Sequence, residues 1–484
     1  MFEWQKEKDR QNLHQLGYVQ ELHRTIDGFS SFAISFSIIS ILSGLVTHFG
    51  FGLKMAGPAA VWTWVVVGFF NTLLAFSLGE IASAFPLAGG VYKWVRKLAG
   101  VRVGWFTGWI SFIGWLGVTA GIDFGLGFFL TSYVGLDSSN LRTVVWITAI
   151  IVTLHTLLNV FGISIVAWFN DFSVTVHIIG VIALVALLLA FGQRHSISIV
   201  FNTGNIQPGH YWYGFTQALL MSAWTLTAFD ASSSVSEESI NPSKTVPWGM
   251  ISAVTVSWFF GALLLLSLDL ALPNLGLLLK TETTATLEIV KSALGPILSN
   301  FVMAIVQVAM FAAGLSSLTV TVRVLFTMAR DDGFPFAKGL KYVSPKYETP
   351  VYSVFFVGGM AVMLCVIGAV LPVITSLSTF SIYLSYAIAL SAALLAKRNG
   401  KVFRGDFSLG RYSTPLQVIS LIWTVFICLD MLLSPTQHTW KFFLGIIVIL
   451  LGYYFAVMRK NLAYKYRRLS ETEIEELEVL RGGR

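Results

Sequence analysis

Long apolar stretches alternate with short polar ones along almost the whole chain. Each stretch holds roughly 18 to 25 residues with few charges, enough for a helix to cross the hydrocarbon core of a bilayer, about 30 Å thick. The pattern predicts an all-α integral membrane protein with twelve transmembrane helices. Their expected ranges are 27–49, 57–84, 104–132, 142–161, 166–191, 212–236, 248–272, 297–327, 351–371, 373–396, 416–434 and 439–458.

The composition agrees with a protein that lies mostly in lipid. Of the 484 residues, 55% are hydrophobic and 12% are charged, and the mean hydropathy is +0.73. An ordinary soluble domain has about 25% charged residues, so that class is excluded. Both cysteines, Cys365 and Cys428, fall inside predicted helices, which indicates neither a disulfide framework nor a cysteine metal site. Because the chain also has no nucleophile motif, metal-spaced histidine pair or phosphate-binding glycine loop, we expect no enzyme activity, cofactor or metal.

Lys and Arg gather on one side of the predicted membrane. With the N-terminus placed in the cytoplasm, most of the 32 Lys and Arg residues fall in cytoplasmic segments, as the positive-inside rule requires. We therefore expect a multi-pass protein of the cytoplasmic membrane with both termini in the cytoplasm. The net charge of +7 is explained by this topology and by contact with anionic lipid headgroups. No nucleic-acid partner is expected, and the sequence is compatible with a monomer or a homodimer.

Two predicted helices carry polar interruptions at membrane depth. The first contains Ser37, Ser40 and Ser43, and the sixth contains the hydroxyl-rich stretch 225–236 with a carboxylate, Asp230. Non-helical backbone at this depth is tolerated only where it is buried in protein or lines a cavity. The two helices lie five spans apart, which is typical of transporters built from inverted repeats with discontinuous helices. Close helix packing is the alternative explanation for a serine-rich helix.

Other polar residues inside predicted helices have two interpretations. Ser316 is a candidate lining residue of a central cavity, and Trp115 lies deep enough to be another, with an interfacial aromatic belt as the alternative for this tryptophan. Asp123 and His155 are each expected to have a structural role in helix packing rather than to bind a ligand. Asp230 is the exception, because a charged group inside a membrane helix is a functional-site hypothesis by default.

Four segments together resemble the amino acid–polyamine–organocation permeases, most closely the amino acid/choline transporter branch. These segments are residues 16–40, 79–94, 224–247 and 313–335. The resemblance implies the leucine-transporter-type fold, in which helices one to five and six to ten are inverted repeats, helices one and six are broken, and helices eleven and twelve are peripheral. The expected parts are a cytoplasmic segment 1–24, a transport core 25–396, a cytoplasmic loop 397–415, peripheral helices 416–458 and a cytoplasmic tail 459–484, with an amphipathic helix at 469–480.

The resemblance also implies a substrate site at the two broken helices. In such permeases the breaks hold the carboxylate and ammonium of an amino acid, and an aromatic side chain of helix six closes over it. Counting back from Asn241 places this aromatic at Trp224. The implied substrate-binding residues are Ser37, Ile38, Ser40, Ile41, Trp115, Trp224, Thr225, Thr227, Ala228, Asp230 and Ser316. The chain departs from the family in the first break, where 37–42 replaces a glycine-rich turn, and at Ser234, where the branch has a histidine.

His177 is the candidate for proton coupling. Many of these permeases have a lysine at the ion-binding position, six residues after an aspartate, and here Asp171 is followed at that distance by His177. Histidine, with an ordinary pKa of about 6.5, gains and loses a proton in the physiological range. The alternative is a neutral histidine bonded within the protein core.

The sequence as a whole predicts a secondary active transporter for an amino acid or small amine. It would work by alternating access, with proton coupling or by exchange. One alternative is a choline- or polyamine-type organocation carrier, in which the face of Trp224 would bind the cation. The other is a nutrient sensor that has kept the fold without transport.

Overall fold

The fold is described from a computed structural model of the chain, which places residues 2–22, 24–204, 210–273, 275–278, 285–367, 371–433 and 439–459. All the regular elements of these residues are helical, and an isolated parallel bridge joins Ile26 to Ser239. The protein is therefore all-α over the described ranges, as predicted. The expected helix at 469–480 lies outside the described residues.

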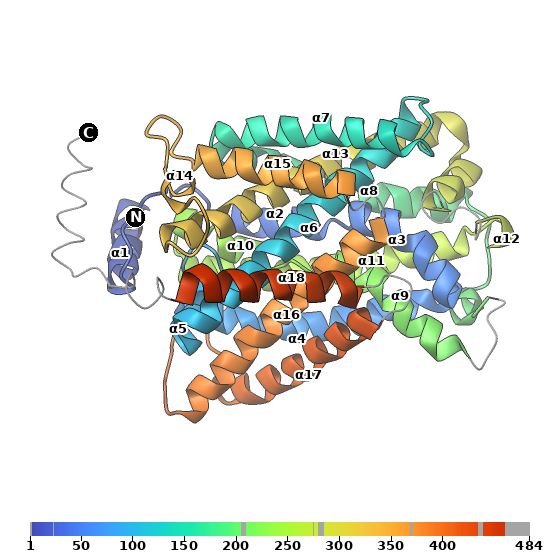
Figure 1. Cartoon of the computed structure of the whole chain (residues 1–484). Coiled ribbons are helices and arrows are strands. Elements are labelled where there is room, and N and C mark those ends of the chain that lie inside the picture. The colour runs from blue at the N-terminus through green and yellow to red at the C-terminus, as the bar shows by residue number, and fades with distance from the viewer. Residues whose placement is uncertain are drawn as a thin grey trace.

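The helices run roughly side by side as one bundle (Figure 1). The longer ones are α1 (Phe2–Gln15), α2 (Gly28–Ile39), α3 (Ile41–Ala56), α4 (Val61–Ala84), α5 (Val91–Ala99), α6 (Val101–Tyr133), α7 (Leu141–Val160), α8 (Ile163–Phe191), α9 (Tyr211–Thr225), α11 (Pro242–Leu270), α13 (Ala285–Arg330), α15 (Val351–Ile367), α16 (Leu371–Arg398), α17 (Ser413–Leu433) and α18 (Thr439–Tyr453). The short ones are η1 (Pro58–Ala60), η2 (Ile197–Phe201), α10 (Ala231–Ser234), η4 (Ser236–Glu238), α12 (Leu275–Leu278), α14 (Ala337–Leu340), η5 (Gly410–Tyr412) and η6 (Tyr454–Met458).

Ten helical stretches of the described residues are long and apolar enough to cross a membrane. Each of them overlaps a predicted span. The other two predicted spans, 212–236 and 351–371, correspond to shorter helices. Helix α9 has 15 residues because the backbone leaves the helix after Thr225, and α15 has 17.

The largest difference from the predicted boundaries is in α13, which extends from Ala285 to Arg330 and is bent at Gly295. Gly295 has φ 71° and ψ 176°, a conformation that glycine adopts without steric cost. The next residue, Pro296, has no backbone N–H to donate. The predicted span 297–327 therefore covers only the part of α13 after the bend.

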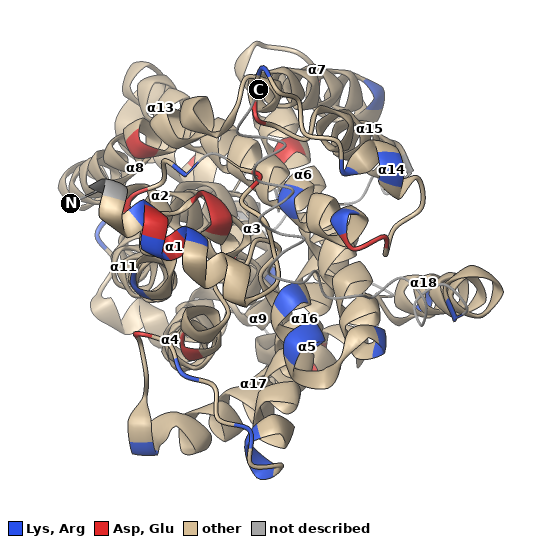
Figure 2. Ribbon diagram, turned by 90° about the vertical axis from the view of Figure 1, so that its left-hand side faces the viewer, with Lys and Arg blue, Asp and Glu red and all other residues tan. Residues whose placement is uncertain are grey.

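Helix α6 lies inside the bundle, in contact with α5, α7, α13, α15 and α16. Large apolar side chains such as Trp146, Ile150 and Phe172 face outward from the bundle, as expected for a surface that contacts lipid. Figure 2 looks onto the end of the bundle that carries α1, α5 and α14, and positions of Lys, Arg, Asp and Glu lie on several segments there. We call this the N-terminal end.

Candidate functional site

The first membrane-spanning segment is interrupted at Ser40. Helix α2 ends at Ile39 and α3 begins at Ile41, and Ser40 between them has φ 28° and ψ 85°. A non-glycine residue with positive φ is strained and is held by its surroundings. The Ser40 hydroxyl accepts a hydrogen bond from the N–H of Ser43 (3.1 Å), which makes it the N-cap of α3.

The second interruption follows α9. Helix α9 ends at Thr225, the backbone is non-helical through Ala228 (φ 60°), and the short α10 follows Asp230. Helix α2 supplies a partner for this irregular backbone, because the Ser35 hydroxyl donates to the carbonyl of Phe229 (2.8 Å) and accepts from the N–H of Ser232 (3.0 Å). The two interruptions therefore lie next to each other.

A small cavity lies between the two interruptions. Its free volume is about 10 Å³, which is about what one water molecule requires. Its walls come from α2, α3, α6 and α9 and from the break after α9. The lining residues are Ile38, Ile39, Ser43, Gly44, Val118, Ile122, Trp224, Thr225, Thr227 and Ala228. The cavity is closed in this conformation, and it is too small for an amino acid.

Five of the implied substrate residues line this cavity, and the others do not. Those that line it are Ile38, Trp224, Thr225, Thr227 and Ala228. Ser37, Ser40 and Ile41 are buried at the first break, beside the cavity lining. Trp115 is buried in α6 outside the lining. Ser316 bonds Asn170 of α8, so its hydroxyl is engaged between two helices.

The Asp230 carboxylate is turned toward α16. It is buried, and its Oδ1 accepts a hydrogen bond from the hydroxyl of Tyr386 (2.5 Å). The ring of Tyr386 also packs against Phe229, with 5.4 Å between ring centroids. Asp230 therefore links the end of the second interruption to α16, and it is outside the cavity lining.

His177 contacts the first interruption directly. The side chain is buried in α8, and its Nε2 accepts a hydrogen bond from the backbone N–H of Leu42 (3.2 Å). Because Nε2 is the acceptor, the neutral ring carries its proton on Nδ1. The ring also packs against Phe36, with 5.1 Å between centroids. His177 thus joins α8 to the start of α3, whereas Asp171 accepts from Ser30 of α2 (2.9 Å).

Two polar residues near the cavity were not anticipated from the sequence. His48 of α3 lies with its ring centroid 5.9 Å from that of Trp224, and Tyr386 holds Asp230. The signal for His48 was present, because it is a titratable residue inside the first predicted span. The sequence contained no such signal for Tyr386, because tyrosines are common in membrane helices.

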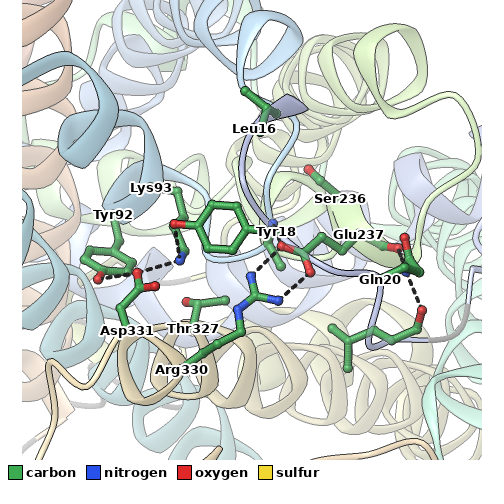
Figure 3. Close-up of polar contacts among 12 residues, drawn as sticks. Leu16, Tyr18, Gln20, Tyr92, Lys93, Ser236, Glu237, Thr327, Arg330 and Asp331 are labelled. Atoms are coloured by element: carbon green, nitrogen blue, oxygen red, sulfur yellow. Dashed lines mark hydrogen bonds and ion pairs between the residues drawn. The ribbon is translucent and has the colours of Figure 1, made fainter. Parts of the chain in front are cut away.

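A network of ion pairs closes the N-terminal end of the bundle (Figure 3). Arg330 of α13 donates two hydrogen bonds to Glu237 (2.7 and 2.8 Å). About two helical turns further into the membrane, Arg323 donates in the same way to Glu238 (2.7 and 3.0 Å). Bidentate pairs of this kind are stronger than hydrogen bonds between neutral groups. They connect α13 to η4, the element that ends the second interruption.

The N-terminal segment covers the same network. Tyr18 lies over Lys93 of α5, whose Nζ is 4.2 Å from the ring centroid, and Lys93 also contacts Asp331 (2.5 Å). Arg96 bonds both Tyr18 and Asp331. Burial alone would raise the pKa of Asp331, but the positive charges of Lys93 and Arg96 outweigh it and lower the pKa to about 2. Asp331 is therefore ionised while this end is closed.

The fold and the site define a helical membrane protein with two interrupted helices around a central cavity. Residues 26–453 match the family model described as amino acid permease. The chain is similar to the amino-acid permease BAT1 of Arabidopsis thaliana (32% identity, covering 85% of this chain and 86% of the relative). It is also similar to the GABA-specific permease of Saccharomyces cerevisiae (28% identity, 89% and 79%). The chain therefore belongs to the amino acid permease family, which confirms the resemblance seen in the sequence.

Proposed function

We propose that the chain is a secondary active transporter that moves an amino acid or a small amine across the cytoplasmic membrane by alternating access. The observation that carries this proposal is the meeting of two helix interruptions at one buried cavity beneath Trp224. Interrupted helices around a midplane site are the usual substrate site of such transporters. The two relatives named as permeases support the same function.

The proposed architecture has twelve spans with both termini cytoplasmic. Helices one to five and six to ten would form the inverted repeats, with α17 and α18 outside them. In this arrangement α9 and α10 together make the sixth span, and α15 is the ninth. The N-terminal end of α3 would then point its positive dipole end at the substrate carboxylate, and carbonyl groups at the ends of α2 and α9 would take the ammonium.

The closed cavity suits an occluded conformation of such a cycle. On one side the ion pairs of Glu237 and Glu238 hold η4 to α13. On the other side Trp224 packs over the cavity. Substrate entry would require one of these closures to open while the other stays shut.

Proton coupling through His177 has a specific rationale in this geometry. The neutral ring accepts from Leu42 N–H at the start of α3. A protonated ring has no acceptor atom, and it would place a positive charge at the positive end of a helix dipole. Protonation would therefore release the first interruption. Exchange of one substrate for another without protons is the alternative mode.

A ligand screen by thermal shift tests the proposal. A ligand that binds only the folded state, at a concentration about 100 times its Kd, adds about 2.7 kcal/mol to the free energy of unfolding. We expect an amino acid or small amine to raise the melting temperature of the purified protein, and Trp224→Ala to lose the effect. Trp146→Ala, which removes a lipid-facing tryptophan of α7 that is 73% exposed, is the matched control.

The outcomes of the screen separate the candidate functions. A shift with choline or polyamines and none with amino acids would favour the organocation carrier. If none of these compounds shifts the melting temperature, the proposed substrate class is wrong. If Trp224→Ala and Trp146→Ala respond alike, Trp224 has no part in the site.

A further inference from the structure

The ring of His48 joins three helices beside the cavity. His48 belongs to α3 and is buried. Its Nε2 lies 3.2 Å from the hydroxyl oxygen of Thr375 on α16, and its Nδ1 lies 2.9 Å from that of Thr47. Trp224 of α9, which lines the cavity, packs against the ring. His48 is thus the only described histidine that touches a cavity-lining aromatic and a neighbouring helix at once.

The hydrogen-bond partners of His48 fit a ring with two N–H donors. A hydroxyl has one hydrogen to donate and lone pairs to accept with. The Thr47 hydroxyl lies 2.8 Å from the carbonyl oxygen of Ser43, and the Thr375 hydroxyl lies 3.0 Å from that of Leu371. If both hydroxyls donate to these carbonyls, both ring nitrogens face lone pairs. In that arrangement the doubly protonated ring satisfies both contacts, whereas the neutral ring requires Thr47 or Thr375 to donate to its bare nitrogen instead of to a carbonyl.

The surroundings of His48 contain no counter-ion among the described residues. The three groups that face the ring, Thr47, Trp224 and Thr375, do not titrate near neutral pH. The one acidic residue of α6, Asp123, lies 3.2 Å from His155. On α13, Glu288 lies two residues after Thr286, whose hydroxyl donates to the Val46 carbonyl (3.3 Å). The described contacts of the His48 ring do not include Glu288.

Opposite effects act on the two forms of the ring. An unpaired buried charge is costly. Against that cost, the charged ring makes one more hydrogen bond and gains a favourable contact with the tryptophan face. When α3 moves away from α16, both gains are lost and water reaches the ring. Closure of this side and proton binding are thus linked.

We propose that His48 is a proton-binding group that fastens α3 to α16 over Trp224, so that closure of this side of the cavity depends on pH. The inference rests on the proposed transport function and adds a positioning residue to it. His48 acts through Trp224 and Thr375, without contact to the substrate. It is distinct from His177, whose acceptor atom holds the other side of α3.

A fluorescence titration tests the proton site without any substrate. A protonated imidazole quenches the emission of a tryptophan that it touches. Between about pH 8 and pH 5, we expect the purified protein to show a quenching component that is missing in both His48→Gln and Trp224→Phe. Trp146→Phe, at a lipid-facing tryptophan, should keep it. If His48→Gln retains the component, the proposal is wrong.

Thr375 provides a second and milder test of the same contact. Thr375→Val keeps the shape of the side chain and removes the oxygen that accepts from the charged ring. Its titration midpoint should move to lower pH, while Thr375→Ser should titrate like the parent. A midpoint that Thr375→Val leaves unchanged would show that the α16 contact does not depend on the proton. Equal melting temperatures of the variants exclude a folding defect as the cause.

Binding measurements then separate this inference from the proposed function. Linked sites typically alter each other's affinity by about fivefold or more. The measurement is made in His177→Ala, so that His177 does not contribute. In this variant we expect the apparent Kd of a bound amino acid to change with pH by about that factor. In the double variant His177→Ala, His48→Gln, the apparent Kd should not change with pH. Binding without any His48-dependent change would overturn the role of His48 alone. A normal titration with no bound amino acid or amine would overturn the transport proposal alone.

Discussion

Replacing Glu238 by Gln removes one charge from a buried ion pair at the N-terminal end of the bundle. The side chains of Glu238 and Arg323 are each 1% exposed, and they share two hydrogen bonds of 2.7 and 3.0 Å. The backbone carbonyl of Glu238 accepts from Thr25 and Ile26, and the substitution leaves it in place. The variant therefore tests the side-chain pair between η4 and α13.

The expected effect is large because Arg323 would be left buried without a counter-ion. Breaking a buried pair by removing one partner costs about 3 to 5 kcal/mol. If the pair exists only while this end is closed, the full cost falls on the closed state. The equilibrium between closed and open conformations would then shift toward opening by a factor of about 100 to several thousand.

Alkylation of a cysteine in the cavity lining measures this opening. The two native cysteines, Cys365 and Cys428, are buried and would first be replaced by Ala. Ser43→Cys then supplies a single thiol in the cavity lining. In detergent, we expect Glu238→Gln to raise the rate of its modification by about 100-fold or more.

The control is an exposed ion pair at the same end of α13. Asp332 and Lys341 are 3.0 Å apart, with side chains 32% and 38% exposed, and such surface pairs contribute little. Asp332→Asn should leave the alkylation rate unchanged. Replacing both Glu238 and Arg323 by Met removes the unpaired charge and should restore slow alkylation. If Glu238→Gln melts normally and is alkylated at the parent's rate, the ion pair does not close the cavity.

Three further substitutions test separate parts of the account. His177→Ala should weaken the pH dependence of uptake, because it removes the acceptor for Leu42 N–H, and should leave only the part that depends on His48; an unchanged profile in proteoliposomes would refute the role of His177. Asp230→Asn would abolish uptake of amine-bearing cations alone if the carboxylate touches substrate. The bond to Tyr386 instead favours an equal loss for all substrates, and Tyr386→Phe should reproduce it. The pKa of Asp331 is lowered from 3.8 to about 2, so its stabilisation is complete above pH 3.8 and is lost as the pH falls toward 2. The melting temperature of the parent should therefore drop over this range, because about 2 kcal/mol of unfolding free energy is lost. The melting temperature of Asp331→Asn should change less.

The sequence predicted those features that depend on residues close together in the chain. A run of apolar residues must become a helix in lipid, since every backbone group needs an internal partner, and all the predicted ranges that the structure describes contain one. The interruption at Ser40 was visible in the same way, from hydroxyl groups at membrane depth. Boundaries were less certain where one residue decides them, as Gly295 does for the bend of α13.

Contacts between distant parts of the chain had no local signal. His48 and Thr375 are separated by 327 positions and Asp230 and Tyr386 by 156, and no periodicity brings such residues together. The sequence therefore identified Asp230 as an unusual charge but gave no direction for its side chain. Ser316 is a similar example, because its partner Asn170 lies in another helix.

Flux of a labelled ligand through proteoliposomes tests the central claim most directly. The compound that raises the melting temperature would be used, with protein reconstituted in vesicles under an imposed pH gradient, and with unlabelled ligand trapped inside in a parallel set. We predict accumulation driven by the gradient, or exchange with the trapped ligand, and loss of both in Trp224→Ala. Binding of the ligand with neither net flux nor exchange would contradict it and would favour a sensor that has kept the permease fold.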